Sequence, residues 1–121
     1  MVEGARTGGR LTAVVRELAA GQAPSPRRHA VEDLVYVVLD GEVELEVPGR
    51  RWHADAVTAL HVPAGTSHRY RATTRARLLV LATPAAAEPL LVHEQRLTRE
   101  DPALLLALAQ EHRVDFSVDL T

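Results

Sequence analysis

The sequence contains no cysteine, lysine, isoleucine or asparagine. Without cysteine the chain can form no disulfide, no iron–sulfur cluster and no thiolate zinc site, so a bound metal would need His and carboxylate ligands. Without lysine it cannot form a lysine Schiff base with a carbonyl substrate. All 14 basic residues are arginine, a bias typical of a GC-rich genome. These absences restrict the chemistry of any site to imidazole, carboxylate, guanidinium and hydroxyl groups.

The sequence also lacks a long apolar run and a large excess of either charge. No segment approaches the ~18 apolar residues of a membrane-spanning helix, and the N-terminal residues have no apolar core of a signal peptide. The 14 basic residues are balanced by 16 acidic ones, and no basic block is interleaved with aromatic residues. We therefore expect a cytoplasmic protein whose partners are neither a membrane nor a nucleic acid.

The length and the composition predict a single globular domain. The chain has 121 residues, of which 46% are apolar and 25% charged, as in ordinary globular proteins. Domains typically contain about 100–200 residues. We therefore expect one domain over residues 1–121.

Most of the chain has the pattern of short β-strands. Apolar or alternating runs are separated by Gly, Pro, Asp and Ser, which predicts an all-β sandwich or barrel. The Asp40-Gly41 pair predicts a tight hairpin, because glycine accepts the positive φ of such a turn. The expected strands cover residues 11–18, 34–39, 42–47, 50–53, 57–62, 68–72, 77–82 and 90–97. Residues 77–82 are apolar on both faces, which indicates a central strand, and 90–97 would be an outer one.

The periodicity changes near the end of the sequence. Asp101 followed by Pro102 is typical of a helix N-cap with proline at the first helical position. Leu104, Leu105 and Leu108 recur at helical spacing. We expect a barrel over about residues 11–97 and one C-terminal helix over about 101–112, packed on its outside.

Two sets of residues between positions 21 and 72 have a distinctive spacing. They are Gly21, Arg27, His29, Leu34 and Gly41, and then Pro63, Gly65, His68 and Ala72. The first set resembles the first cupin motif, which is a Gly, five residues, His-x-His, three or four residues, Glu, six residues and Gly. The second resembles the second motif, Pro-x-Gly-x-x-His-x-x-x-Asn, with Val57 in place of its opening Gly and Ala72 in place of its closing Asn.

This resemblance covers about residues 11–83. It implies the jelly-roll barrel, or double-stranded β-helix, of small RmlC-like cupins. The helix at 101–112 and the tail at 114–118 also resemble the C-terminal extension of bacterial cupins called quercetin-dioxygenase-like.

The resemblance implies a divalent metal site but transfers only half of its ligands. In the family, both His of the first motif, its Glu and the His of the second motif bind the metal. Here Arg27 and Leu34 stand at two of those positions, and His29 and His68 at the others. Catalytic metal sites commonly use three protein ligands, whereas only His29 and His68 remain here. The guanidinium of Arg27 would also repel a divalent cation. We therefore expect no metal cofactor; Fe, Ni, Mn or Zn would need Glu32 or a substrate oxygen to complete the site.

The inward-facing side chains of these strands predict a pocket for a small, anionic molecule. A guanidinium matches a carboxylate or phosphate, a neutral imidazole can move a proton, and a tyrosine hydroxyl can donate to a developing oxyanion. Alternation along each strand places such groups on shared faces. The candidates are His29, His68, Arg27 and Tyr36 for catalysis, and Tyr70, Leu34 and Trp52 for substrate binding.

Three functional classes remain open at this stage. The leading hypothesis is an enzyme without a redox metal, an isomerase, cyclase or lyase that transfers a proton. The alternatives are a metal-dependent dioxygenase-like cupin and a non-catalytic module that binds a carboxylated metabolite through Arg27. A purely structural interpretation also stands, in which Arg27 pairs with Glu32 or Asp33 at the rim of the barrel.

The strand at residues 34–39 also predicts an association between copies of the chain. Val35, Val37 and Leu39 make its second face apolar as well. Because an exposed apolar sheet face needs a cover, we expect a homodimer. Trp52 is an alternative candidate for the core or the dimer interface.

Overall fold

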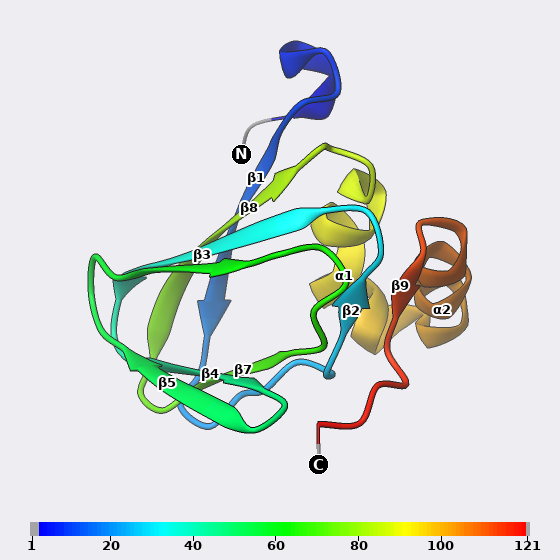
Figure 1. The fold of residues 1–121 in the computed structure, drawn as a ribbon. Helices are drawn as coiled ribbons and strands as arrows, with labels where there is room; N and C mark the ends of the chain where they lie inside the picture. Colours follow the sequence, from blue (N-terminus) through cyan, green and yellow to red (C-terminus); the bar gives the residue numbers. More distant parts are fainter. Residues whose placement is uncertain (1–2, 121) are drawn as a thin grey trace.

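The structure is a computed structural model that describes residues 3–120. Figure 1 shows two sheets facing each other, with both helices gathered at one side of them. The elements in chain order are η1 (Gly4–Thr7), β1 (Thr12–Leu18), β2 (Arg28–His29), β3 (Asp33–Asp40), β4 (Val43–Val47), β5 (Arg50–Ala54), β6 (Ala59–Val62), β7 (Arg69–Ala72), β8 (Ala76–Thr83), α1 (Glu88–Glu100), α2 (Pro102–Glu111) and β9 (Val114–Asp115).

The strands form two facing antiparallel sheets, together called the barrel, which within residues 3–120 do not join into one closed sheet as a barrel in the strict sense would. A four-stranded sheet has the order β1-β8-β3-β6 and a three-stranded sheet the order β5-β4-β7, while β2 pairs with β9. The central position predicted for residues 77–82 is confirmed, because β8 pairs with β1 on one side and β3 on the other. The side chains that fill the space between the sheets include Val14, Leu18, Leu34, Tyr36, Val38, Leu45, Tyr70, Leu78 and Val80.

The prediction of a hairpin at Asp40-Gly41 is wrong. β3 pairs with β6 and β8, whereas β4 pairs with β5 and β7, so the chain crosses here from one sheet to the other. Gly41 does have a positive φ of 80°. A Cβ atom at this position would lie 2.2 Å from the carbonyl oxygen of Arg75. Local sequence therefore indicated the turn conformation correctly but not the strand with which the next segment pairs.

The prediction of an outer strand at residues 90–97 is also wrong, because these residues belong to α1. Its buried face consists of Leu90, Leu91, Glu94 and Leu97, which recur at helical spacing. Because the charged Glu94 interrupts this apolar stripe, the helical period was not recognised in the sequence. The β-structure that forms the two sheets therefore ends at Thr83, and residues 3–120 contain two α-helices where one was expected.

The helix predicted at the C-terminal end is confirmed as α2. The Asp101 carboxylate accepts a hydrogen bond from the backbone N–H of Leu104 at 3.1 Å, as expected of an N-cap. Leu105 and Leu108 pack against a second cluster that includes Leu90. α2 thus packs against α1 and β9. Among residues 3–120, no helix is long and apolar enough to cross a membrane.

Candidate binding site at the helix-covered side of the barrel

Arg27 is buried inside the barrel and paired with a carboxylate from α1. It precedes β2, and its backbone forms two hydrogen bonds of 2.9 Å with that of His68. The residue is 3% exposed, and its Nη1 and Nη2 each donate to one oxygen of Glu94 at 2.5 Å. The guanidinium also lies 5.0 Å from the ring centre of Phe116. The predicted pairing of Arg27 with Glu32 or Asp33 is therefore wrong.

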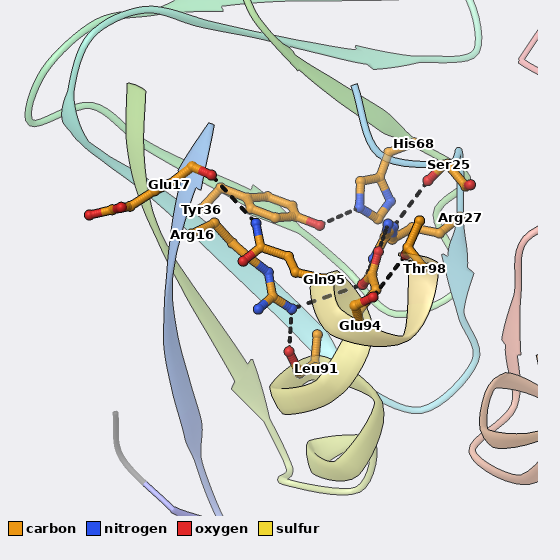
Figure 2. Close-up of polar contacts among 10 residues, drawn as sticks. All are labelled: Arg16, Glu17, Ser25, Arg27, Tyr36, His68, Leu91, Glu94, Gln95 and Thr98. Atoms are coloured by element: carbon orange, nitrogen blue, oxygen red, sulfur yellow. Dashed lines mark hydrogen bonds and ion pairs between the residues drawn. The ribbon is translucent and has the colours of Figure 1, made fainter. Parts of the chain in front are cut away.

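A second buried arginine approaches the same carboxylate. Arg16 lies on the inward face of β1, donates a hydrogen bond to the carbonyl oxygen of Leu91, and has its Nη2 at 3.9 Å from Oε1 of Glu94 (Figure 2). Sequence reasoning missed both Arg16 and Glu94. The available signals were the alternation of Val14, Arg16 and Leu18 on β1 and the helical stripe around Glu94.

The charges of this group do not cancel. Burial by itself would raise the pKa of Glu94, but the charge and hydrogen bonds of Arg27 and the charge of Arg16 outweigh it, so the pKa of Glu94 is lowered. Burial likewise opposes the charged form of Arg27, and the Glu94 carboxylate reverses the effect and raises the pKa of Arg27. Two guanidinium groups therefore share one carboxylate, which leaves a local excess of positive charge.

Tyr36 and His68 form a hydrogen-bonded pair deeper in the barrel. The Tyr36 hydroxyl lies 2.7 Å from Nε2 of His68, and Nδ1 of the same ring lies 3.0 Å from the carbonyl oxygen of Thr66. Burial, opposed by the Thr66 carbonyl and reinforced by the charges of Arg27 and His29, lowers the pKa of His68 to about 4. Burial raises the pKa of Tyr36. At neutral pH, His68 is a neutral acceptor and Tyr36 a neutral donor.

His29 and Glu32 form a second buried pair. Nδ1 of His29 lies 2.7 Å from Oε1 of Glu32, and the two side chains are 2% and 0% exposed. Residues 30–32 bend between β2 and β3, which turns Glu32 inward as a ligand role would have required. Nε2 of His29 and Oε2 of Glu32 are buried without a hydrogen-bond partner. The carboxylate thus orients the imidazole and leaves its second nitrogen open.

The residues present do not fit the divalent metal site that the resemblance to cupins implies. Leu34 is 1% exposed in the core and offers no ligand atom. The guanidinium of Arg27 and the carboxylate of Glu94 bind each other, and Tyr36 occupies Nε2 of His68. Within residues 3–120, no three His, Asp or Glu side chains are grouped closely enough to hold a metal ion.

A cavity of about 720 Å³ opens where the barrel meets the two helices. Arg16, Tyr70 and Glu94 form part of its wall, whereas Arg27 and His29 do not line it. Its other walls include Gln22, Ser25, Gln95, Thr98, Arg99, Leu105, Leu106 and Phe116. Three of its lining residues, Ser25, Glu94 and Phe116, contact the side chain of Arg27.

The structure brings together only some of the residues proposed for substrate binding. Tyr70 borders the cavity, and its ring centre lies 5.1 Å from that of Tyr36. Leu34 belongs to the core, away from the cavity. Trp52 lies on β5 at the margin of the core, with the Arg50 guanidinium 4.4 Å from its ring centre. Neither Leu34 nor Trp52 borders the cavity, so their predicted role in substrate binding has no support here.

Two antiparallel sheets that enclose buried His, Tyr and Arg side chains, with a cavity at one side, define a jelly-roll protein of the type that binds small molecules. The family model described as "Cupin domain" matches residues 14–83, and the chain belongs to the cupin family. This match contains both arginines and both buried histidines but ends before α1, which supplies Glu94.

Solved structures agree with this assignment. KdgF from Halomonas sp. is 25% identical, with a TM-score of 0.61 over 63% of this chain and 70% of that one. TT1209 from Thermus thermophilus is 32% identical, with a TM-score of 0.58 over 63% and 74%. A putative ethanolamine utilization protein Q from Salmonella typhimurium, 24% identical over 70% and 66% with a TM-score of 0.61, shows the fold alone. No curated protein was found to match the sequence.

Proposed function

We propose that this cupin binds a small carboxylate-bearing molecule without a metal cofactor and transfers a proton on it, as an isomerase, cyclase or lyase does. The observation that carries the proposal is the group of two buried guanidiniums around one carboxylate at the wall of the cavity. Such an excess of positive charge in a buried setting favours an anion, because the charges are little screened by water.

The cavity is suited to a ligand with an apolar body and a charged end. Its volume of about 720 Å³ is in the usual range for ligand cavities. Its lining combines the guanidinium of Arg16 with the apolar side chains of Leu105, Leu106 and Phe116. We therefore expect a carboxylate directed toward Arg16 and an apolar part against α2 and the C-terminal segment.

The buried pairs beyond the cavity supply proton-transfer groups. Because Glu32 binds Nδ1 of His29, Nε2 is the nitrogen that can accept a proton from a substrate. The Tyr36 hydroxyl donates its one proton to neutral His68, so it would have to release Nε2 of His68 before it could donate to an oxygen on which negative charge develops. In an isomerase, the proton taken up by His29 would return to another atom of the same substrate.

A non-catalytic binding module is the second candidate. None of the proposed proton-transfer groups, His29, Tyr36 and His68, lines the cavity, which favours binding without chemistry. A metal-dependent dioxygenase is less well supported, because Arg27 and Leu34 stand where two ligands would be needed.

Three measurements test the proposal. Elemental analysis of purified protein should find well under one divalent metal per chain; stoichiometric Fe, Ni, Mn or Zn that survives dialysis would favour the dioxygenase.

Calorimetry with a panel of small carboxylates should show binding that Arg16→Gln weakens about 10-fold or more, since a charge-assisted hydrogen bond is lost. Arg75→Gln, an exposed change in the bend before β8, is the control. A panel without any Arg16-dependent binding contradicts the proposal.

The same carboxylates, incubated with the protein in D₂O, test the chemistry by proton NMR. Wild type should exchange a carbon-bound proton for deuterium, and His29→Gln should not. Binding without exchange in any member of the panel would favour the binding module over the enzyme.

A further inference from the structure

We infer that Arg16 and Arg27 form a carboxylate-binding site in which Glu94 is the resident ligand, and that the carboxylate of a molecule entering the cavity takes the place of Glu94. The inference rests on the proposed function only in taking that molecule to be a carboxylate. It assigns to Glu94 the role of an internal competitor for the ligand site.

The geometry of the Glu94 carboxylate is that of a bound ligand. Each of its oxygens accepts one hydrogen bond from Arg27 at 2.5 Å, and Oε1 also lies 3.9 Å from Nη2 of Arg16 (Figure 2). This parallel, two-point pairing is how a guanidinium recognises a free carboxylate. A ligand carboxylate at the same place would find the same donors.

The two charges of the site come from different parts of the fold. Arg16 lies on β1 and Arg27 directly before β2, so the barrel supplies both cations. Glu94 lies on α1, outside the segment that matches the cupin family model. The β-structure therefore supplies both cations of the site, and α1 supplies its anion together with the Leu91 carbonyl that accepts from Arg16.

Glu94 also borders the cavity, whereas Arg27 and His29 do not. Its carboxylate binds Arg27, and His29 lies near enough for its charge to lower the pKa of Glu94. Rotation of the Glu94 side chain into the cavity would free the donors of Arg27 for the incoming carboxylate. The exchange conserves charge, because one carboxylate leaves the guanidiniums as another arrives.

The direct test removes the Glu94 carboxylate and leaves the guanidiniums of Arg16 and Arg27 in place. Glu94→Ala should unfold at a lower temperature than wild type in chloride, and acetate or formate at equal ionic strength should raise its midpoint in a saturable way, by about 6 °C at ten times the dissociation constant. Glu100→Ala is the matched control, because Glu100 is an exposed residue of the same helix paired with Arg96. Wild type and the control should respond equally to acetate and chloride. A Glu94→Ala variant that responds no more than the control overturns the inference.

If Glu94→Ala does not fold in chloride, its refolding yield is measured in acetate and in chloride. A higher yield in acetate supports the site, and equal yields overturn it. Benzoate should bind Glu94→Ala more tightly than acetate, since its ring would lie in the cavity near Leu105 and Phe116. Benzoate that binds no better than acetate contradicts entry through the cavity.

Failure of this inference can be told apart from failure of the proposed function. Acetate rescue of Glu94→Ala without carboxylate binding by wild type would support the site and contradict the proposed function. Conversely, a carboxylate that binds wild type should bind Glu94→Gln about tenfold more tightly, because the competing charge is gone. An unchanged affinity would overturn the role of Glu94 and leave the proposed function standing.

Discussion

The hydroxyl oxygen of Tyr36 lies 2.7 Å from Nε2 of His68, and Nδ1 of that ring lies 3.0 Å from the carbonyl oxygen of Thr66. A carbonyl oxygen can only accept a hydrogen bond, so Nδ1 carries the proton and Nε2 accepts from Tyr36. Both ring nitrogens of His68 are therefore engaged while the ring is neutral. Protonation would break the bond from Tyr36 in a buried setting.

We expect the free energy of unfolding to rise with pH between about 4 and 6.5. In the folded protein the pKa of His68 is lowered from 6.5 to about 4, mainly by burial. Within this window the unfolded chain takes up the proton and the folded protein does not. The contribution is thus fully present above pH 6.5 and lost as the pH falls through 4, and amounts to roughly 3 kcal/mol. Urea unfolding from pH 4.5 to 7.5 measures it, and His68→Gln should have a shallower slope. Equal slopes would contradict the assignment.

We expect Arg27→His combined with Leu34→Glu to create a metal site. The two changes restore the ligand types of the family beside His29 and His68, and so provide three imidazoles and one carboxylate. Without metal the double variant should be several kcal/mol less stable than wild type, because a buried carboxylate lacks a partner. Fe(II), Ni(II) or Zn(II) should restore its thermal midpoint. Arg28→His, at an exposed neighbouring position, is the control. If added metal raised the thermal midpoint of wild type as much as that of the double variant, Arg27 and Leu34 would not stand at the positions of the family's metal ligands.

The homodimer remains a prediction, now with a defined surface. On the outward face of the four-stranded sheet, Val15 and Val37 flank Leu79, and Val35 lies beside Leu81. Val15 is 42% exposed, and the other four are partly exposed. Such a continuous apolar face is typical of an interaction surface. Light scattering at micromolar concentration should give a dimer for wild type and a monomer for Val37→Arg.

Leu104→Arg is the control for that experiment, because Leu104 is an exposed apolar residue on α2, away from the sheet. It should remain a dimer. A wild type that is monomeric under these conditions would remove the argument from the apolar face.

We expect Val57→Gly to stabilise the protein by about 1 kcal/mol. Val57 stands where the second cupin motif usually opens with glycine, and its φ of 62° lies in the left-handed region. A β-branched side chain is strained there, whereas glycine is not. The side chain is 88% exposed, so little packing is lost. Thermal and urea unfolding measure the gain; a less stable Val57→Gly would show that Val57 makes a compensating contact.

Strand alternation was sufficient to predict which side chains point into the barrel. Leu34 and Tyr36 share one inward face, and His68 and Tyr70 another, and all four are at most 4% exposed. Arg27 and His29 also share an inward side, as their spacing of two predicted. These predictions succeeded because successive side chains of a strand point to opposite faces whatever the strand pairs with.

Local rules of this kind could not predict which strands pair with one another. The turn at Gly41 was recognised from its residues, but the sheet that the following strand joins depends on contacts with β5 and β7. Similarly, the stripe at residues 90–97 is ambiguous between strand and helix until the surface that it covers is known.

Spacing and side-chain chemistry are local properties, so the sequence alone was enough to recognise the cupin motifs, the inward residues and the presence of Arg27 and Leu34 where those motifs imply metal ligands. The groups that contact these two side chains depend on how the whole chain folds. Glu94 lies 67 residues after Arg27 and reaches it only because α1 packs across the barrel. Whether a buried guanidinium is paired with a carboxylate depends on which charged groups the fold places beside it. The resemblance to cupins therefore implied that Arg27 stands at a ligand position, and the fold determined that a carboxylate of the same chain binds it.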